Sequence, residues 1–207
     1  DIYTALGCEV TMIEALERVM PTFDPDLTKI ATRHLIEGRD IDAKAGLLAS
    51  KVSPGCPVKV QLANANTREF VEELEVDAVL VATGRIPSSK ELNLDSLGID
   101  LVKGFIPIDD RMRVLCKGEV IPNLWAVGDV TGKLMLAHTA AAQGTIAVEN
   151  IINKPRKIDY RSIPAATFTH PEISSVGLTE AGAKELALKD KFELGSVRSY
   201  FKANSKA

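Results

Sequence analysis

Strand-like and helix-like patterns of hydrophobic residues alternate in the first part of the chain. Residues 8–15 form a β-branched and apolar run that ends in a carboxylate, and they predict a buried strand. Residues 24–38 predict an amphipathic helix, with Asp24 as N-cap, Pro25 in the first turn and Gly38 at the end. Residues 1–6 resemble the end of a helix. One face of the helix over 24–38 would carry Leu27, Ile30, Ala31, His34 and Leu35.

The next segments favour strands. Residues 45–52, 58–65 and 69–76 are strand-like, and turn residues such as those at 53–57 separate them. They predict an antiparallel meander. Residues 78–84 are apolar and end in small residues, which is typical of a strand inside a parallel sheet. The first part is therefore expected to be an α/β unit with an inserted β meander.

After a polar linker at 85–99, the second half also alternates between strand-like and helix-like segments. We expect a short strand pair over 104–114, a buried strand over 123–130 and a long helix over 138–153. A second linker follows at 154–164. The pattern then changes to strand-like residues at 166–179, a helix led by Thr179 and a strand at 195–201.

Composition narrows the function classes. The 207 residues are 45% hydrophobic and 26% charged, with a net charge of −3 and scattered Lys and Arg, so we expect neither a nucleic-acid nor a membrane partner. No apolar run approaches the roughly 20 residues that span a bilayer. The chain opens with Asp1 in a helix-like stretch and stops beyond a strand-like run, so we interpret it as a fragment of a longer protein.

Cysteine and histidine positions give no catalytic group. Cys8, Cys56 and Cys116 are far apart, without CxxC, CxxxxC or metal-ligand spacing, which predicts free thiols and no metal site. His170 and Glu172 flank Pro171, which adds a turn between them, so we do not expect acid–base chemistry there.

Carboxylates and glycines at strand ends are the candidate binding residues. In dinucleotide-binding folds, an acidic residue placed like Glu14 accepts hydrogen bonds from a ribose and disfavours the extra phosphate of NADP, although nearby Arg18 weakens that argument. Gly84 would bring bare backbone to the sheet edge, and Asp129 could accept from a polyol hydroxyl. The alternatives are a solvated terminus, an ordinary strand–turn and a turn-capping Asp.

A helix that starts near His138 would direct free N–H groups and a positive dipole end toward a ligand. Such a start could stabilise a reduced flavin, and the small residues that follow would permit a close approach. The alternative is an Ala-rich core helix.

The order of four motifs resembles the pyridine nucleotide–disulfide oxidoreductases. These are VTMIEA, LVATGRIP, NLWAVGDVTGKLMLAHTAAAQG and AATFTHPEISSVGLTE. MLAH with AAAQG, and FTHPEISSVGLTE, are most similar to the dihydrolipoamide dehydrogenase branch. LWAVGDVTGK and residues 200–204 resemble its plastid and cyanobacterial members, which implies a plastid stroma or a cyanobacterial cytoplasm.

The resemblance implies doubly wound α/β nucleotide-binding folds with β meanders, followed by the start of an α+β dimerisation domain. Residues 1–85 would form the C-terminal part of the NAD-binding domain, residues 86–157 the central, second part of the FAD-binding domain, and residues 158–207 the N-terminal part of the homodimer interface domain. Glu14, Val52 and Gly84 would contact NAD at the ribose, adenine and nicotinamide. Asp129 would bind the ribitol and phosphate region of FAD, and Met135, Leu136, Ala137 and His138 would lie along the flavin.

Family elements missing from the 207 residues limit what this chain could do alone. Both GxGxxG loops, the redox CxxxxC and the His–Glu dyad are absent, so no residue here is assigned a catalytic role. The whole protein would oxidise dihydrolipoyl groups carried by an acyltransferase of a 2-oxo acid dehydrogenase complex or by the glycine cleavage carrier protein. The alternatives are a glutathione or mercuric reductase and a non-catalytic nucleotide-binding module.

Overall fold

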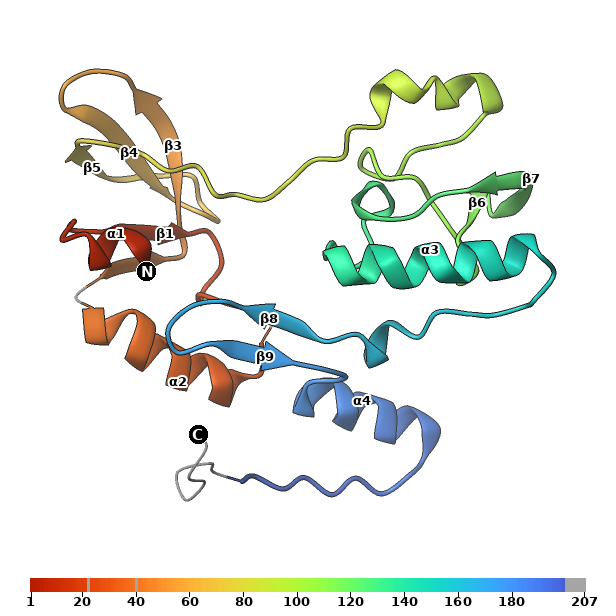
Figure 1. Cartoon of the computed structure of the whole chain (residues 1–207). Helices are drawn as coiled ribbons and strands as arrows, with labels where there is room; N and C mark the ends of the chain where they lie inside the picture. Colours follow the sequence, from red (N-terminus) through yellow and green to blue (C-terminus); the bar gives the residue numbers. More distant parts are fainter. Residues whose placement is uncertain (22, 40, 200–207) are drawn as a thin grey trace. The chain divides into compact units, whose positions relative to one another are not determined.

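The fold begins with two parallel strands that a helix connects. The computed structural model describes residues 1–21, 23–39 and 41–199. After the short helix α1 (Ile2–Ala5), β1 (Thr11–Glu14) pairs in parallel with β2 (Asp42–Ala45), and α2 (Pro25–Leu35) connects them (Figure 1). The predicted Asp24 cap is confirmed, because its carboxylate accepts from the Asp26 N–H at 3.2 Å. The predicted end is wrong: α2 ends at Leu35, and Gly38 lies in a 3₁₀ turn, η1 (Glu37–Arg39).

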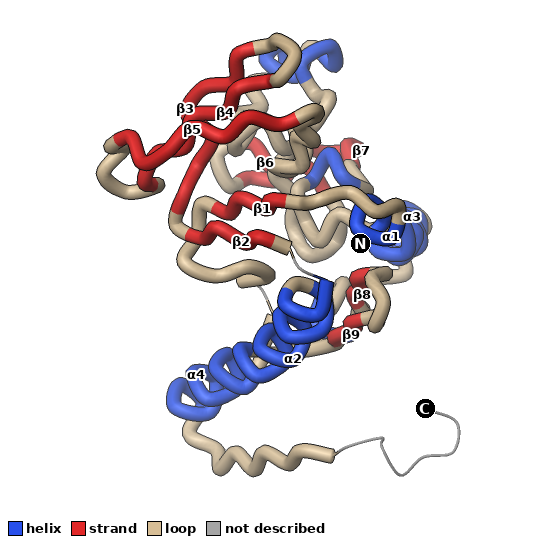
Figure 2. The backbone as a smooth tube through the Cα atoms, turned by 90° about the vertical axis from the view of Figure 1, so that its left-hand side faces the viewer, coloured by secondary structure: helices blue, strands red, loops and turns tan. Residues whose placement is uncertain are grey.

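The buried face of α2 is narrower than the sequence predicted. Ala31 and Leu35 are buried with Ile173 of β9 (Ile173–Ser175), which lies beside α2 in Figures 1 and 2. The stripe is centred on residues 28, 31 and 35, which share one face at 100° per residue. Ile30 and His34, which the sequence placed on the same face, fall outside this stripe and are exposed.

The predicted meander is confirmed. β3 (Leu47–Ser53), β4 (Val58–Asn64) and β5 (Phe70–Val76) form an antiparallel sheet in that order. The central strand β4 buries Val60 and Leu62, which lie two residues apart and therefore point to the same face of the sheet. This sheet follows directly on β2, with Gly46 between them.

Residues 78–84 do not form the predicted buried strand. The run is irregular, with Leu80 70% and Val81 75% exposed. A parallel strand needs neighbours for its backbone groups, and the sheet of β1 and β2 has two strands among the described residues. For the same reason β1 is at most half-buried, where the sequence predicted a buried strand.

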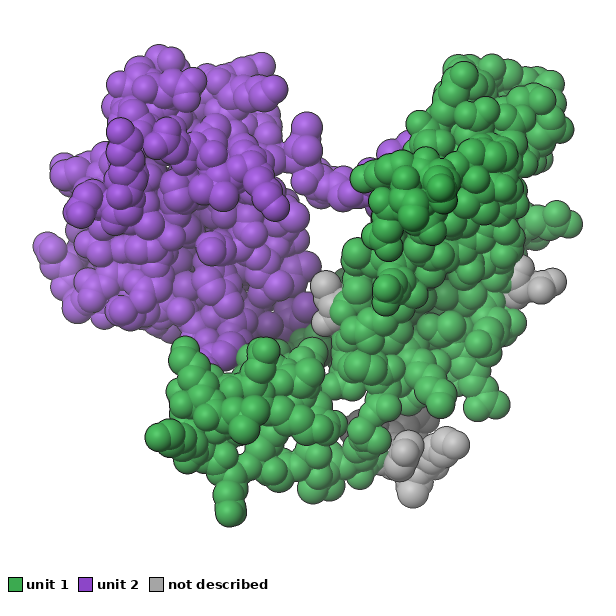
Figure 3. Space-filling model, turned by 180° about the vertical axis from the view of Figure 1, so that it is seen from behind, with its two compact units in different colours: residues 1–80, 166–207 green, residues 81–165 purple. Residues whose placement is uncertain are grey.

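The chain divides into two compact units, which Figure 3 colours separately. Unit 1 contains Asp1–Leu80 and Ala166–Ala207, and unit 2 contains Val81–Ala165. In unit 2 the helix α3 (Ala137–Ile151), predicted over 138–153, is confirmed. Its Ile146 and Ala147 pack into a core with Ile99, Ile106, Ile108, Met112, Val114 and Ala126.

The remaining elements of unit 2 differ from the sequence prediction. The predicted linker 85–99 contains η2 (Lys90–Leu92) and η3 (Leu94–Leu97), and its Ser89 and Ile99 are buried. In place of a strand pair over 104–114, isolated bridges join Val102 to Phe105 and Ile108 to Val114. The strand predicted over 123–130 is β7 (Glu119–Trp125), paired with β6 (Arg113–Cys116). It ends before Gly128, where the chain turns into η4 (Asp129–Thr131).

Residues up to Ala165 still belong to unit 2, and those from Ala166 on belong to unit 1. After η5 (Tyr160–Ser162), β8 (Ala165–Thr167) pairs with β9, and α4 (Glu180–Asp190) starts at the predicted cap Thr179, whose hydroxyl accepts from the Gly182 N–H at 3.2 Å. The predicted terminal strand is wrong over 195–199, which have no strand pairing among the described residues. Positions 200–204, which carried part of the resemblance, lie outside the described residues.

Candidate nucleotide-binding sites

Glu14 lies at the carboxyl end of β1, opposite Ala45 at the same end of β2. Ligands of open α/β sheets bind beyond this edge. One oxygen of the half-buried carboxylate accepts from the Leu16 N–H at 2.9 Å, and this hydrogen bond holds the carboxylate at the strand end. Arg18 donates to the Pro21 carbonyl at 2.9 Å, so its guanidinium is held within its own loop.

The other two predicted NAD residues lie in different units. Val52 is 46% exposed on β3, opposite Val60 of β4, and belongs to unit 1 with Glu14. Gly84 belongs to unit 2 and has φ +118, a conformation that favours glycine. Apart from Gly84 and its two chain neighbours, no atom of the described chain lies within 4 Å of the position that a Cβ on Gly84 would take, so the backbone is accessible there.

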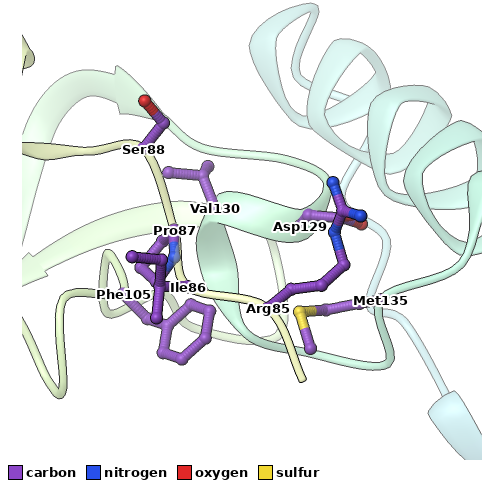
Figure 4. Close-up of a pocket in the computed structure, with 8 residues that line it drawn as sticks. All are labelled: Arg85, Ile86, Pro87, Ser88, Phe105, Asp129, Val130 and Met135. Carbon is purple, nitrogen blue, oxygen red and sulfur yellow. The ribbon is translucent and has the colours of Figure 1, made fainter. Parts of the chain in front are cut away.

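A hollow of about 280 Å³ in unit 2 brings the first predicted flavin residues together. Asp129 and Met135 both line it, and in Figure 4 the Arg85 side chain extends toward Asp129. Asp129 is exposed, so its carboxylate is available to a ligand. The other lining residues are Ile86, Pro87, Ser88, Phe105 and Val130.

Buried side chains hold the turn that presents Asp129. Gly128 has φ +82 and ψ −162, a region that only glycine adopts readily. Its N–H donates to Oε1 of Gln143 at 2.6 Å, and its carbonyl accepts from the Thr131 hydroxyl at 2.8 Å. Both side chains are buried, so the backbone on either side of Gly128 is fixed.

The start of α3 follows the hollow without a side-chain cap. Leu136 is the N-cap residue and is half-buried, whereas Met135, Ala137 and His138 are exposed. The N–H groups of the first turn therefore have no side-chain partner at the cap. The ring Nε2 of His138 lies 2.6 Å from the Pro164 carbonyl, which fixes the imidazole at the helix start.

The arrangement fits FAD. An exposed carboxylate beside a hollow can accept from hydroxyls, and an uncapped helix start can stabilise negative charge. Thr139, in the first turn of α3, has a buried hydroxyl that finds no hydrogen-bond partner among the described residues, which leaves a donor and an acceptor unused there. The carboxylate at the end of β1 fits an NAD ribose in the same way.

Three supporting residues were missed in the sequence: Gln143, Tyr160 and Thr131. Gln143 and Thr139 are buried with Ile146 and Ala147, at the spacing i, i+4, i+7 and i+8 of one helix face. The two polar residues, Thr139 and Gln143, share a helix face with apolar residues, and this pattern could have predicted that Gln143 is buried. Tyr160 gave no comparable signal, because its contact with Gln143 joins positions 17 apart.

Further reactive and charged side chains lie outside the two candidate sites. Cys8, Cys56 and Cys116 are free thiols, as predicted. Asp109 accepts from the Arg113 side chain at 2.7 Å and from the backbone N–H groups of Arg111 and Arg113. Within the described ranges, no group of three or more His, Cys, Asp or Glu side chains could hold a metal, and none of the helices could cross a membrane.

Comparisons with known proteins cover the whole chain. Residues 1–144 match the family described as pyridine nucleotide-disulphide oxidoreductase, and residues 163–207 match the dimerisation domain of that family. A dihydrolipoyl dehydrogenase of Synechocystis is 57% identical over 100% of this chain and 44% of its own length. The chloroplastic dihydrolipoyl dehydrogenase 2 of Arabidopsis thaliana is 50% identical over 100% of the chain and 37% of its own length.

The crystal structure of LpdA from Mycobacterium tuberculosis has a TM-score of 0.76 and 29% identity, over 90% of this chain and 39% of that one. The chain thus spans less than half the length of each relative. These matches confirm the expected fold class and the resemblance to cyanobacterial and chloroplast dihydrolipoyl dehydrogenases. The chain belongs to the pyridine nucleotide-disulphide oxidoreductase family.

Proposed function

We propose that this chain forms part of a dihydrolipoyl dehydrogenase that uses FAD and NAD. The observation that carries the proposal is the 57% identity to such an enzyme over the entire chain. The hollow at Asp129 and the uncapped start of α3 support it, because both suit a flavin. Bound FAD would take two electrons from thiols by way of a disulfide and pass them as hydride to NAD.

The residues of this chain bind and orient in the proposal. Asp129 accepts from hydroxyls of the FAD ribitol region, and the backbone N–H groups at 136–138 face the negative charge of the reduced flavin, beside Met135. Glu14 accepts from the NAD ribose and repels the phosphate of NADP. Val52 lines the adenine pocket, and Gly84 approaches the nicotinamide side.

The catalytic groups belong to other segments in this proposal. The three cysteines of the chain are free thiols far apart in sequence, so we assign the redox disulfide to segments outside the 207 residues. We assign the His–Glu pair of the family to such segments as well. We assign 1–85 to the NAD-binding domain, 86–157 to the FAD-binding domain and 158–207 to the homodimer interface. The match of 163–207 to a dimerisation domain supports the last assignment.

The partners and the location follow from the same assignment. A dihydrolipoyl dehydrogenase would act on the lipoyl-bearing acyltransferase of a 2-oxo acid dehydrogenase complex or on the carrier protein of glycine cleavage. Identities of 57% and 50% to a cyanobacterial and a chloroplastic relative support a cyanobacterial cytoplasm or a plastid stroma.

The test is a substrate comparison on the full-length protein. We expect NADH formation from dihydrolipoamide and NAD. Reduction of glutathione disulfide or mercuric ion with NADPH, without dihydrolipoamide oxidation, would make it another flavin disulfide reductase. Nucleotide binding without any turnover would make it a non-catalytic module.

The flavin assignment has its own test. The full-length Asp129→Ala variant should purify with less FAD than the wild type, because a hydroxyl acceptor is lost. Asp100→Ala, an exposed carboxylate of the same unit that does not line the hollow, is the control. An unchanged flavin content and visible spectrum in Asp129→Ala would contradict the assignment.

A further inference from the structure

Gln143 joins two segments of unit 2 from inside α3. Its side chain is 0% exposed, although glutamine is mostly found at protein surfaces. Its Oε1 accepts from the Gly128 N–H at 2.6 Å, and its Nε2 donates to the Tyr160 hydroxyl at 2.9 Å. A single amide therefore connects the turn before Asp129 with the 3₁₀ turn η5.

The orientation of this amide follows from its partners. A backbone N–H can only donate, so Oε1 of Gln143 must face Gly128. The Nε2 group must then face Tyr160, and the Tyr160 oxygen must accept. Burial raises the pKa of Tyr160, and the hydrogen bond from Gln143 opposes that rise in part, so the phenol is neutral at physiological pH.

We propose that Gln143 is a positioning residue for FAD binding, which acts by fixing the Gly128–Asp129 turn against α3. Gln143 does not line the hollow, so it acts through the turn. Gln143 holds the peptide group before Gly128, and Thr131 holds the one after it. Rotation at Gly128 would move the Asp129 carboxylate, and the two hydrogen bonds oppose that rotation. The inference rests on the proposed role of Asp129.

A core role without any effect on the cofactor is the alternative. In that case an apolar residue of similar size would change stability and leave FAD affinity unchanged. The experiment measures the FAD dissociation constant and the thermal midpoint of the full-length protein for Gln143→Leu. We expect about a 10- to 100-fold weaker FAD affinity, since the Gly128 N–H loses its buried acceptor.

Two matched variants separate positioning from stability. Ile146→Ala lies on the same buried stripe, and we expect a lower thermal midpoint with an unchanged FAD dissociation constant. Gln143→Glu keeps an acceptor for Gly128, and burial favours the neutral acid, which can also donate to Tyr160. We expect its FAD affinity to stay close to that of the wild type at low pH and to fall as the acid ionises.

A double-mutant cycle with Asp129→Ala tests the route of the effect. If Gln143 acts through Asp129, the two losses of affinity are not additive, because both substitutions weaken the same contact between Asp129 and FAD. Additive losses would overturn the inference. A normal affinity in Gln143→Leu, together with a weakened one in Asp129→Ala, would overturn it and leave the proposed function intact.

The remaining outcomes are also decisive. A normal affinity in Asp129→Ala would remove the flavin assignment, and with it this inference. If Gln143→Leu does not fold, Tyr160→Phe takes its place, because it removes only the hydroxyl that anchors the amide. We expect about 3- to 10-fold weaker FAD binding there, and an unchanged dissociation constant would overturn the proposal.

Discussion

Replacing Gly128 with alanine tests the backbone conformation that presents Asp129. At φ +82 and ψ −162, a residue with a side chain is strained by about 1–3 kcal/mol. Space is not the obstacle, because the new Cβ would lie 3.6 Å from the Cβ of Ala140, an ordinary contact. If the backbone relaxes instead, the hydrogen bond to Gln143 is lost at a cost of about 0.5–1.5 kcal/mol. Either way, Gly128→Ala should lower the free energy of unfolding, by about 0.5–3 kcal/mol.

The assay is denaturant unfolding of the full-length protein, with the FAD dissociation constant measured in parallel. Gly144→Ala is the matched control, because Gly144 lies inside α3 without a positive φ and without an atom within 4 Å of its future Cβ in the described chain. Alanine there should be neutral or stabilising by up to about 1 kcal/mol. A Gly128→Ala variant as stable as the wild type, with normal FAD affinity, would refute the reasoning.

Three further predictions concern NAD, pH and the chain alone. In the full-length enzyme, Glu14→Ala should raise the apparent constant for NADH by the loss of one charge-assisted pair, roughly 1.5–3 kcal/mol, and a kinetic preference for NADP in the wild type would contradict the role of Glu14. Partial burial would raise the pKa of Asp109, but hydrogen bonds from Arg113 and from two backbone N–H groups outweigh it and lower the pKa. Its stabilising effect is thus present above the pKa of the unfolded chain and is lost as pH falls through the lowered value. Asp109→Asn should therefore destabilise at pH 7, and the difference should shrink in acid denaturation below pH ~4. The purified 207-residue chain should give no NADH from dihydrolipoamide with FAD and NAD supplied, and turnover above a flavin-only blank would overturn the assignment of the disulfide to other segments.

The sequence predicted those elements that local chemistry determines. Asp24 and Thr179 cap their helices through N–H groups two or three residues away, so the signal and its effect lie in the same few positions. The meander is similar, because its strands are adjacent in the chain and alternate in polarity. The flavin role of residues 135–138 was predicted from the motif around them and stays a prediction, and the structure adds the helix start without a side-chain cap.

The incorrect predictions concern contacts between residues that are distant in sequence. The apolar run at 78–84 has the composition of a buried parallel strand, but composition cannot say whether a neighbouring strand is present. The strand before Asp129 was placed too late, because its pairing with β6 ends at Trp125. Gln143 was missed because its hydrogen bonds reach 15 and 17 positions along the chain. Local periodicity contains no information about such contacts.

The carboxylate of Asp24 closes a long loop in unit 1. One oxygen accepts from the Asp26 N–H at the start of α2, and the other accepts from the Glu180 N–H at the start of α4, 156 positions later. The whole of unit 2 lies within that loop, because its residues are contiguous in sequence. A ribosome therefore releases every residue of unit 2 before it has made α4. Of the two units, unit 1 is therefore started first during synthesis and completed last.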